Sequence, residues 1–109
     1  MSTKKSIEAT CPECRGPLSL LITDGLVEIS CLVGHAYSVE GVLHAHSETQ
    51  EKALWSAVVA LRETTALVDA LSHRLPSDVL EKLRAQVATK HQQAAVIQNI
   101  IEHLEPFQV

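Results

Sequence analysis

Aromatic side chains are scarce in this chain of 109 residues, where they make up only 3% of the composition. They are Tyr37, Trp55 and Phe107. Proteins that hold single-stranded nucleic acid commonly stack its bases on several aromatic rings, so the scarcity argues against such a surface. The interior must therefore be built from aliphatic side chains and alanine. With 46% hydrophobic and 20% charged residues, the composition is still typical of a globular protein.

Positive charge is also in short supply. The chain has 9 Lys and Arg against 13 Asp and Glu, which gives a formal net charge of -4. A protein that binds a phosphate backbone or an anionic membrane needs clustered positive charge. We therefore expect a protein as the partner, rather than a nucleic acid or a membrane.

Long apolar runs are missing as well. The longest apolar stretches, such as residues 18–22, are far shorter than the roughly 20 residues that span a bilayer. The N-terminal segment places polar residues where a signal peptide needs an apolar core. We therefore expect a cytoplasmic protein, in which cysteines are more often metal ligands or catalytic groups than disulfides. The three cysteines fit this view, because an odd number cannot be fully paired within one chain.

Glycine is absent from residue 48 onward, which divides the chain into two predicted parts, residues 1–46 and 47–109. In the second part apolar residues recur every three or four positions, which is the pattern of amphipathic helices. Pro76 predicts a break, and Ser77 with Asp78 predicts the N-cap of a second helix. Because the connection is short, we expect the two helices to form a long antiparallel hairpin.

Both predicted helices carry apolar residues away from their main stripes, and one partner helix cannot cover them all. We therefore expect the hairpin to pair with a second copy, giving a homodimer with a four-helix bundle. The other interpretation is that the first part of the chain folds back over these residues. They are Ala57, Ala60 and Leu67 in the first helix, and Val79, Val96 and Ile100 in the second.

A β-hairpin is predicted in the first part, because Asp24-Gly25 separates two apolar runs. This dipeptide favours a type I′ turn, which needs positive φ at both central residues. A two-residue loop places Ile22 opposite Val27, Leu20 opposite Ile29 and Leu18 opposite Cys31. The same register brings Cys31 close to Cys14.

The motif that carries chemistry is Cys11-Pro-Glu-Cys14 followed, after 16 residues, by Cys31-x3-His35. Three thiolates and an imidazole complete the tetrahedral shell of a structural zinc ion and leave no open position. We therefore predict one structural Zn²⁺ per chain, bound by Cys11, Cys14, Cys31 and His35, with no catalytic residues. His44 and His46 are alternatives to His35 as the fourth ligand. Gly16 and Gly34 are expected in the tight turns around the metal.

The predicted fold class is α+β: a small zinc-ribbon β-hairpin followed by a long antiparallel α-helical hairpin. We expect a short helix over residues 39–46, capped by Ser38, to complete the ribbon. So few residues of sheet and turn cannot bury enough apolar area to be stable alone. Metal binding is therefore expected to supply part of the folding free energy.

Several segments resemble a known module: Cys11-Pro-Glu-Cys14, Asp24-Gly25-Leu26, the run from Cys31 to Ser38, Ala53-Leu-Trp55 and Leu61-Arg-Glu63. They are similar to the zinc-ribbon-plus-helix extension at the C-terminus of some bacterial chemotaxis methylesterases of the CheB type. The similarity covers about residues 9 to 72. It implies an accessory module in bacterial signalling, with the same four metal ligands. The methylesterase catalytic domain has no counterpart in this sequence, so the resemblance does not imply that activity.

The sequence therefore favours a non-catalytic, zinc-binding protein-interaction module of an adaptor or accessory kind, related to signalling and to chemotaxis. Two alternatives stay open. One is a transcription-related or nucleic-acid-binding zinc ribbon. The other is a thiol-based redox or metal sensor, in which oxidation of the thiolates ejects the zinc ion.

Overall fold

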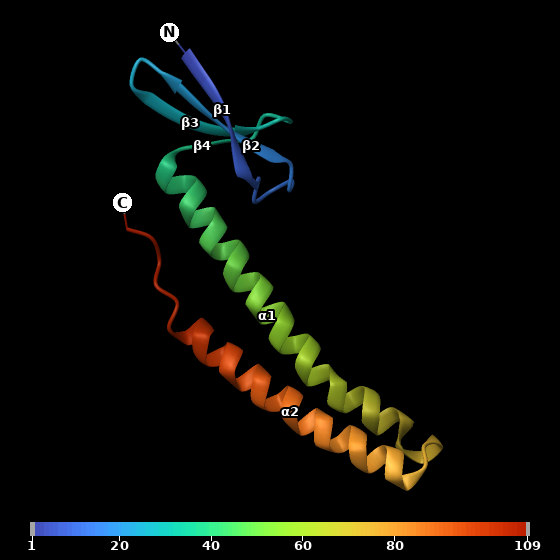
Figure 1. The fold of residues 1–109 in the computed structure, drawn as a ribbon. Coiled ribbons are helices and arrows are strands. Elements are labelled where there is room, and N and C mark those ends of the chain that lie inside the picture. Colours follow the sequence, from blue (N-terminus) through green and yellow to red (C-terminus); the bar gives the residue numbers. More distant parts are fainter. Residues whose placement is uncertain (1, 109) are drawn as a thin grey trace. The chain divides into compact units, whose positions relative to one another are not determined.

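The structure is a computed structural model that describes residues 2–108, and over these residues a four-stranded antiparallel sheet is followed by two α-helices (Figure 1). The strands lie in the order β1-β2-β3-β4. This confirms the predicted α+β fold class and the helical hairpin. The elements are β1 (Ser2–Thr10), β2 (Pro17–Thr23), β3 (Leu26–Cys31), β4 (Ala36–Tyr37), α1 (Val39–Leu71), a 3₁₀ turn (Ser72–Arg74) and α2 (Ser77–Glu102).

Contacts divide the chain into two compact units. The first comprises the residues up to Gln50 together with the C-terminal residues from Glu105, and the second is Glu51–Leu104. The boundary therefore lies four residues beyond the predicted division at 46/47, inside a continuous helix. One reason is His46, whose ring Nε2 lies 3.0 Å from the carbonyl oxygen of Thr10 and so links this part of α1 to β1.

The β2–β3 hairpin has the predicted register, with Leu18, Leu20 and Ile22 opposite Cys31, Ile29 and Val27 respectively. Its turn has φ values of 52° at Asp24 and 80° at Gly25. Positive φ at both positions is the signature of a type I′ turn, whose twist matches that of the two strands. The turn residues therefore fix which side chains face the core.

Strand β1 and the two-residue strand β4 extend the hairpin on either side and were not predicted. β1 pairs with β2 over its whole length, with an irregularity between Ile7 and Thr10. Its first residues are polar and exposed, and only Ile7 and Ala9 are half-buried. Lysines on an edge strand, here Lys4 and Lys5, hinder its pairing with strands of other chains. The strand was not predicted because its residues do not alternate between apolar and polar, which is the pattern that indicates a strand in a sequence.

The core of the first unit lies between the sheet and the first turns of α1. Its buried members come from β2, β3, α1 and the turn that begins at Cys11. Five half-buried residues pack against them: Ile7, Ala9, Leu20, Tyr37 and Leu43. Two metal-ligand candidates are thus part of the core, so the metal site and the apolar packing are built from the same side chains. The buried members are Cys11, Leu18, Ile29, Cys31 and Val42.

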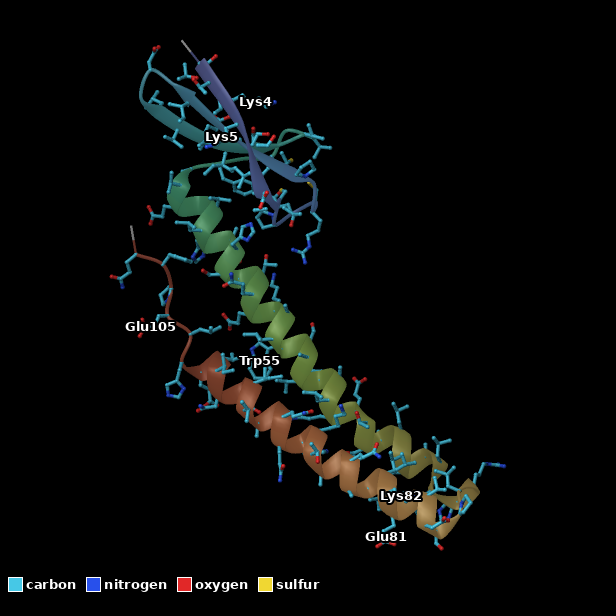
Figure 2. All side chains as sticks on the ribbon, in the orientation of Figure 1. Lys4, Lys5, Trp55, Glu81, Lys82 and Glu105 are labelled. Carbon is cyan, nitrogen blue, oxygen red and sulfur yellow. The ribbon has the colours of Figure 1, made fainter. Side chains whose placement is uncertain are left out.

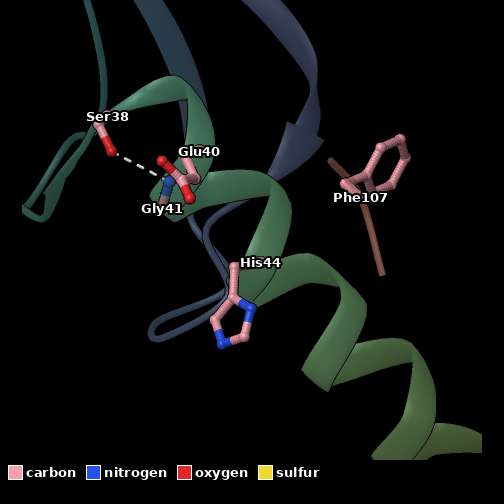
Figure 3. Close-up of a pocket in the computed structure, with 5 residues that line it drawn as sticks. All are labelled: Ser38, Glu40, Gly41, His44 and Phe107. Carbon is pink, nitrogen blue, oxygen red and sulfur yellow. Dashed lines mark hydrogen bonds between the residues drawn. The ribbon is translucent and has the colours of Figure 1, made fainter. Parts of the chain in front are cut away.

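Helix α1 begins at Val39 behind the predicted cap, Ser38. The Ser38 hydroxyl accepts a hydrogen bond of 3.0 Å from the backbone N–H of Gly41 (Figure 3). The helix does not stop at residue 46, so the prediction of a separate short helix is wrong. No glycine or proline interrupts the following residues, and the hydroxyls of Ser47 and Thr49 bond back to the carbonyls of Leu43 and Ala45.

The second unit consists of α1 from Glu51 onward and α2, which run side by side and antiparallel (Figure 1). Val58, Val68 and Ala94 are buried in this unit. Two exposed polar links add to it: Arg62 donates to Gln98 Oε1 at 2.6 Å, and Arg84 pairs with Asp69 at 3.0 Å.

The chain breaks between the helices as predicted at Pro76, but the predicted cap is absent. Pro76 itself occupies the N-cap position of α2, and no side chain caps the helix. Proline cannot offer an N–H there, yet its carbonyl accepts the first intrahelical bond, from the N–H of Leu80. Among the described residues, neither helix has the length of apolar sequence that crossing a membrane requires.

Candidate metal centre

The four predicted ligands lie on two tight turns of the first unit. In one turn, the N–H of Cys11 donates to the carbonyl of Gly16 at 2.7 Å, and the N–H of Arg15 donates to the carbonyl of Cys11 at 2.8 Å. In the other, the N–H of Cys31 donates to the carbonyl of His35 at 3.0 Å. Each turn therefore carries two candidate ligand side chains, and backbone hydrogen bonds within the turn hold its conformation.

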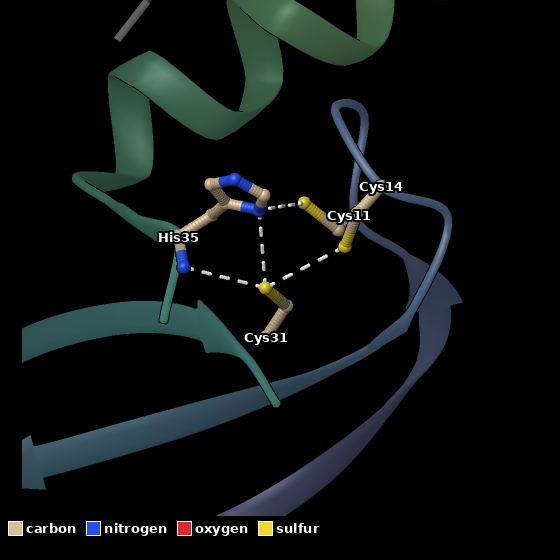
Figure 4. A group of neighbouring side chains, drawn as sticks. All are labelled: Cys11, Cys14, Cys31 and His35. Atoms are coloured by element: carbon tan, nitrogen blue, oxygen red, sulfur yellow. Dashed lines mark hydrogen bonds between the residues drawn. The ribbon is translucent and has the colours of Figure 1, made fainter. Parts of the chain in front are cut away.

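The donor atoms of Cys11, Cys14, Cys31 and His35 all lie within 4.8 Å of one another (Figure 4). His35 Nδ1 is 3.3 Å from Cys31 Sγ and 3.6 Å from Cys11 Sγ, and the sulfurs of Cys14 and Cys31 are 3.6 Å apart. Thiolates at about 2.3 Å from a tetrahedral ion would be separated by about 3.8 Å. The cluster thus fits a tetrahedral metal ion, and these residues can hold one.

The other two histidines considered as the fourth ligand have other partners. His46 contacts the Thr10 carbonyl, as described above. His44 Nε2 lies 3.0 Å from Glu48 Oε1, one turn further along α1. His35 alone of the three joins the cysteines, because the short turn after Cys31 returns the chain to the same end of the sheet.

The two glycines of the turns have different roles. Gly34 has φ of +102°, a conformation that L side chains rarely adopt, so glycine is required there as expected. Gly16 does not have positive φ, and the residue that does is its neighbour Arg15, at +64°. A Cβ on Gly16 would lie 3.3 Å from Cys14 Sγ, so glycine at this position allows a close approach to the sulfur.

Hydrogen bonds to the sulfurs favour thiolates. Burial acts to raise the pKa of Cys11, but hydrogen bonds from the Tyr37 hydroxyl and from the backbone of Cys14 and Glu13 outweigh it and lower this pKa to about 6. Burial likewise acts to raise the pKa of Cys31, and the backbone N–H groups of His35 and Val33 lower it overall. Without a metal ion, the thiolate forms of Cys11 and Cys31 are therefore favoured relative to those of a free cysteine.

Cys14 behaves differently. A hydrogen bond from the N–H of Gly16 acts to lower its pKa, but burial and the neighbouring Cys31 and Cys11 raise the pKa above the usual value. One group in a cluster of three sulfurs thus tends to keep its proton, because three adjacent negative charges repel one another. A bound divalent cation would remove that repulsion and release the proton.

Two further residues complete the site and were not assigned to it from the sequence. Glu13 Oε2 lies 3.1 Å from Nε2 of His35, and the Tyr37 hydroxyl lies 3.2 Å from Cys11 Sγ. With Nε2–H donating to the carboxylate, Nδ1 of His35 is left free to bind a metal ion. Glu13 stands inside the Cys-x2-Cys motif, but nothing in the sequence pairs its carboxylate with His35, which lies 22 residues further on.

Comparison with known proteins gives no family to which the chain can be assigned. No protein-family model, curated protein or solved structure matches it. The assignment of the site therefore depends on the donor atoms, their distances and their hydrogen bonds.

We expect the substitution Glu13→Gln to weaken metal binding about 10- to 100-fold, the usual cost of losing a carboxylate behind a histidine ligand. The amide keeps the size of the side chain but removes the charge that favours the Nε2–H form. A competition titration against a chromophoric chelator measures this affinity. Glu8→Gln, on strand β1, is the matched control, and equal affinities for all three proteins would contradict the assigned role of Glu13.

Proposed function

We propose that the chain is a zinc-dependent protein-interaction module without catalytic activity. The observation that carries this proposal is a four-donor Cys3His cluster directly beneath an exposed apolar turn. Zinc is the metal that this donor set suits best, because borderline-soft Zn²⁺ takes tetrahedral sulfur and nitrogen ligands. All four positions of such an ion would be filled by the protein, which leaves none for a substrate or an activated water.

The turn between Cys31 and Gly34 presents two large apolar side chains to solvent. Leu32 is 78% exposed and Val33 is 73% exposed. A bound zinc ion would fix this turn from below, through Cys31 and His35, and would thereby hold both side chains outward. Adjacent apolar side chains exposed on one turn form a small apolar patch of the kind that a protein partner can cover.

The charge of the first unit favours a protein partner over nucleic acid. Its residues, up to Gln50 and from Glu105, include three Lys and Arg against seven Asp and Glu, a formal charge of -4. A phosphate backbone would be repelled by this unit. We further propose that the partner belongs to a bacterial signalling pathway related to chemotaxis, which rests on the resemblance described under Sequence analysis.

Capture of partners from cells of the source organism tests the interaction. Wild-type bait is compared with a Leu32→Ser/Val33→Ser double variant, and with Leu26→Ser, which changes a residue that is 76% exposed in the β2–β3 hairpin. We expect the double variant to keep about one zinc per chain and to lose proteins that the wild type and Leu26→Ser both retain. Identical sets of proteins on all three baits would contradict the proposal.

Cobalt substitution tests whether the site is closed. Co²⁺ in a tetrahedral thiolate site absorbs visible light, and the absorption changes when an added small ligand enters the coordination sphere. We expect one Co²⁺ per chain and a spectrum that is insensitive to an excess of added imidazole. A spectrum that shifts on addition would reveal an open position and would favour a catalytic site.

A further inference from the structure

The strongest feature outside the metal site is an uncovered apolar face on α1 in the second unit. At about 100° per residue, ten positions between Ala53 and Leu71 point away from the stripe that contains the buried Val58 and Val68. All ten are exposed, and Glu63 is the single charged residue among them. We call this surface the α1 outer face; its large apolar members are Trp55, Val59, Leu67 and Leu71 (Trp55 is labelled in Figure 2).

The α1 outer face is unusual for a helix in contact with water. Val59 is 51% exposed, Leu67 is 64% exposed and Leu71 is 49% exposed. A helix that is apolar on nearly all sides is normally buried on all sides. The two other charged residues of this stretch, Arg62 and Asp69, bond to side chains of α2 and so leave the outer face apolar.

We propose that a second copy of this chain covers the α1 outer face, so that the α1 helices of the two copies pack against each other. The charge of the second unit supports a self-association. Glu51–Leu104 contains six Lys and Arg and six Asp and Glu, a formal charge of zero. Two copies of this unit therefore meet without net repulsion, whereas the first unit, at -4, would repel its own copy.

The shape of the α1 outer face suits a neighbouring helix. Trp55, Val59 and Ala60, with Ser56 and Glu63, line a hollow of about 380 Å³. Alanines lie between the large side chains at positions 53, 60, 66 and 70, and small residues allow two helices to approach closely. A helix of a second copy would place its large side chains in the hollow and over these alanines.

Analytical ultracentrifugation of the full zinc-loaded chain over a range of concentrations tests this inference, which does not depend on the proposed function. We expect twice the monomer mass for the wild type. The substitution Leu67→Glu should raise the dimer dissociation constant about 30-fold or more, as for a central contact of an interface. A wild type that stays monomeric up to high micromolar concentration would overturn the inference.

The matched control is Val96→Glu on α2. Val96 is 61% exposed, and it lies about 200° around the helix from the buried Ala94, on the side turned away from α1. We expect this variant to remain a dimer with the wild-type affinity. If it dissociates as readily as Leu67→Glu, the interface is not the α1 outer face. Helical circular dichroism and zinc content, measured on the same samples, separate loss of the dimer from unfolding and from loss of the metal.

Discussion

Removal of zinc, or its exclusion by Cys31→Ser, is expected to unfold the sheet of the first unit while the helices of Glu51–Leu104 remain folded. Binding of zinc to a structural site contributes about 10 to 16 kcal/mol, which is comparable to the whole stability of a typical domain. Cys31 is buried in the core cluster and is also a ligand, so its loss removes the metal and leaves the packing incomplete.

Amide hydrogen exchange, read residue by residue, measures this result. In the chelated wild type and in Cys31→Ser, protection should disappear from β1 to β4 and persist in the helices of the second unit. Ser30→Ala, which alters the neighbouring residue of the same strand, is the control and should keep both zinc and protection. A sheet that stays protected without metal would show that the apolar core alone is sufficient.

Truncation of Leu18 to alanine is expected to lower the free energy of unfolding of the first unit by about 2 to 5 kcal/mol. Leu18 is only 3% exposed, and it lies opposite Cys31 in the β2–β3 register. Its removal leaves a cavity beside the cluster that holds the metal ligands. In a unit with so few buried side chains, this is a large share of the total stability.

Urea denaturation of the zinc-loaded protein, followed by the fluorescence of a reporter dye attached to the N-terminus, measures the effect on the first unit. Leu26→Ala is the matched control, because Leu26 is 76% exposed at the end of the same hairpin. A surface substitution of this kind usually changes stability by no more than about 0.5 kcal/mol. Equal losses for the two variants would show that Leu18 is not part of a close-packed core.

The parts of the fold that were predicted from sequence are those set by local chemistry. Asp24-Gly25 determines the turn and hence the register, and the spacing of the cysteines and His35 is read directly from the chain. Residues whose structure or role depends on a partner far away in the sequence could not be identified from a local motif. The polar strand β1 owes its structure to pairing with β2, and the carboxylate of Glu13 owes its role to a histidine 22 residues away.

The length of α1 was missed for a related reason. The sequence of residues 47 to 51 is polar, Ser-Glu-Thr-Gln-Glu, and resembles a helix start because serine and threonine compete for backbone hydrogen bonds. In the structure both hydroxyls bond back to the preceding turn instead, and the helix continues. The packing of Val42 and Leu43 against the core of the first unit favours this outcome, since it holds the preceding turns in helical conformation.

Because α1 is shared by the two compact units, we expect the place where it begins to depend on a metal ion bound in the first unit. If the sheet unfolds without zinc, Val42 loses the core against which it packs and His46 loses its contact with Thr10, so we expect the first turns of α1 to unfold with the sheet. Ser47 and Gln50 have the spacing of a capping box, so the shortened helix has a second N-cap ready within its own sequence. We therefore expect loss of zinc to shorten α1 as far as Ser47 and to leave the remainder of the helix folded.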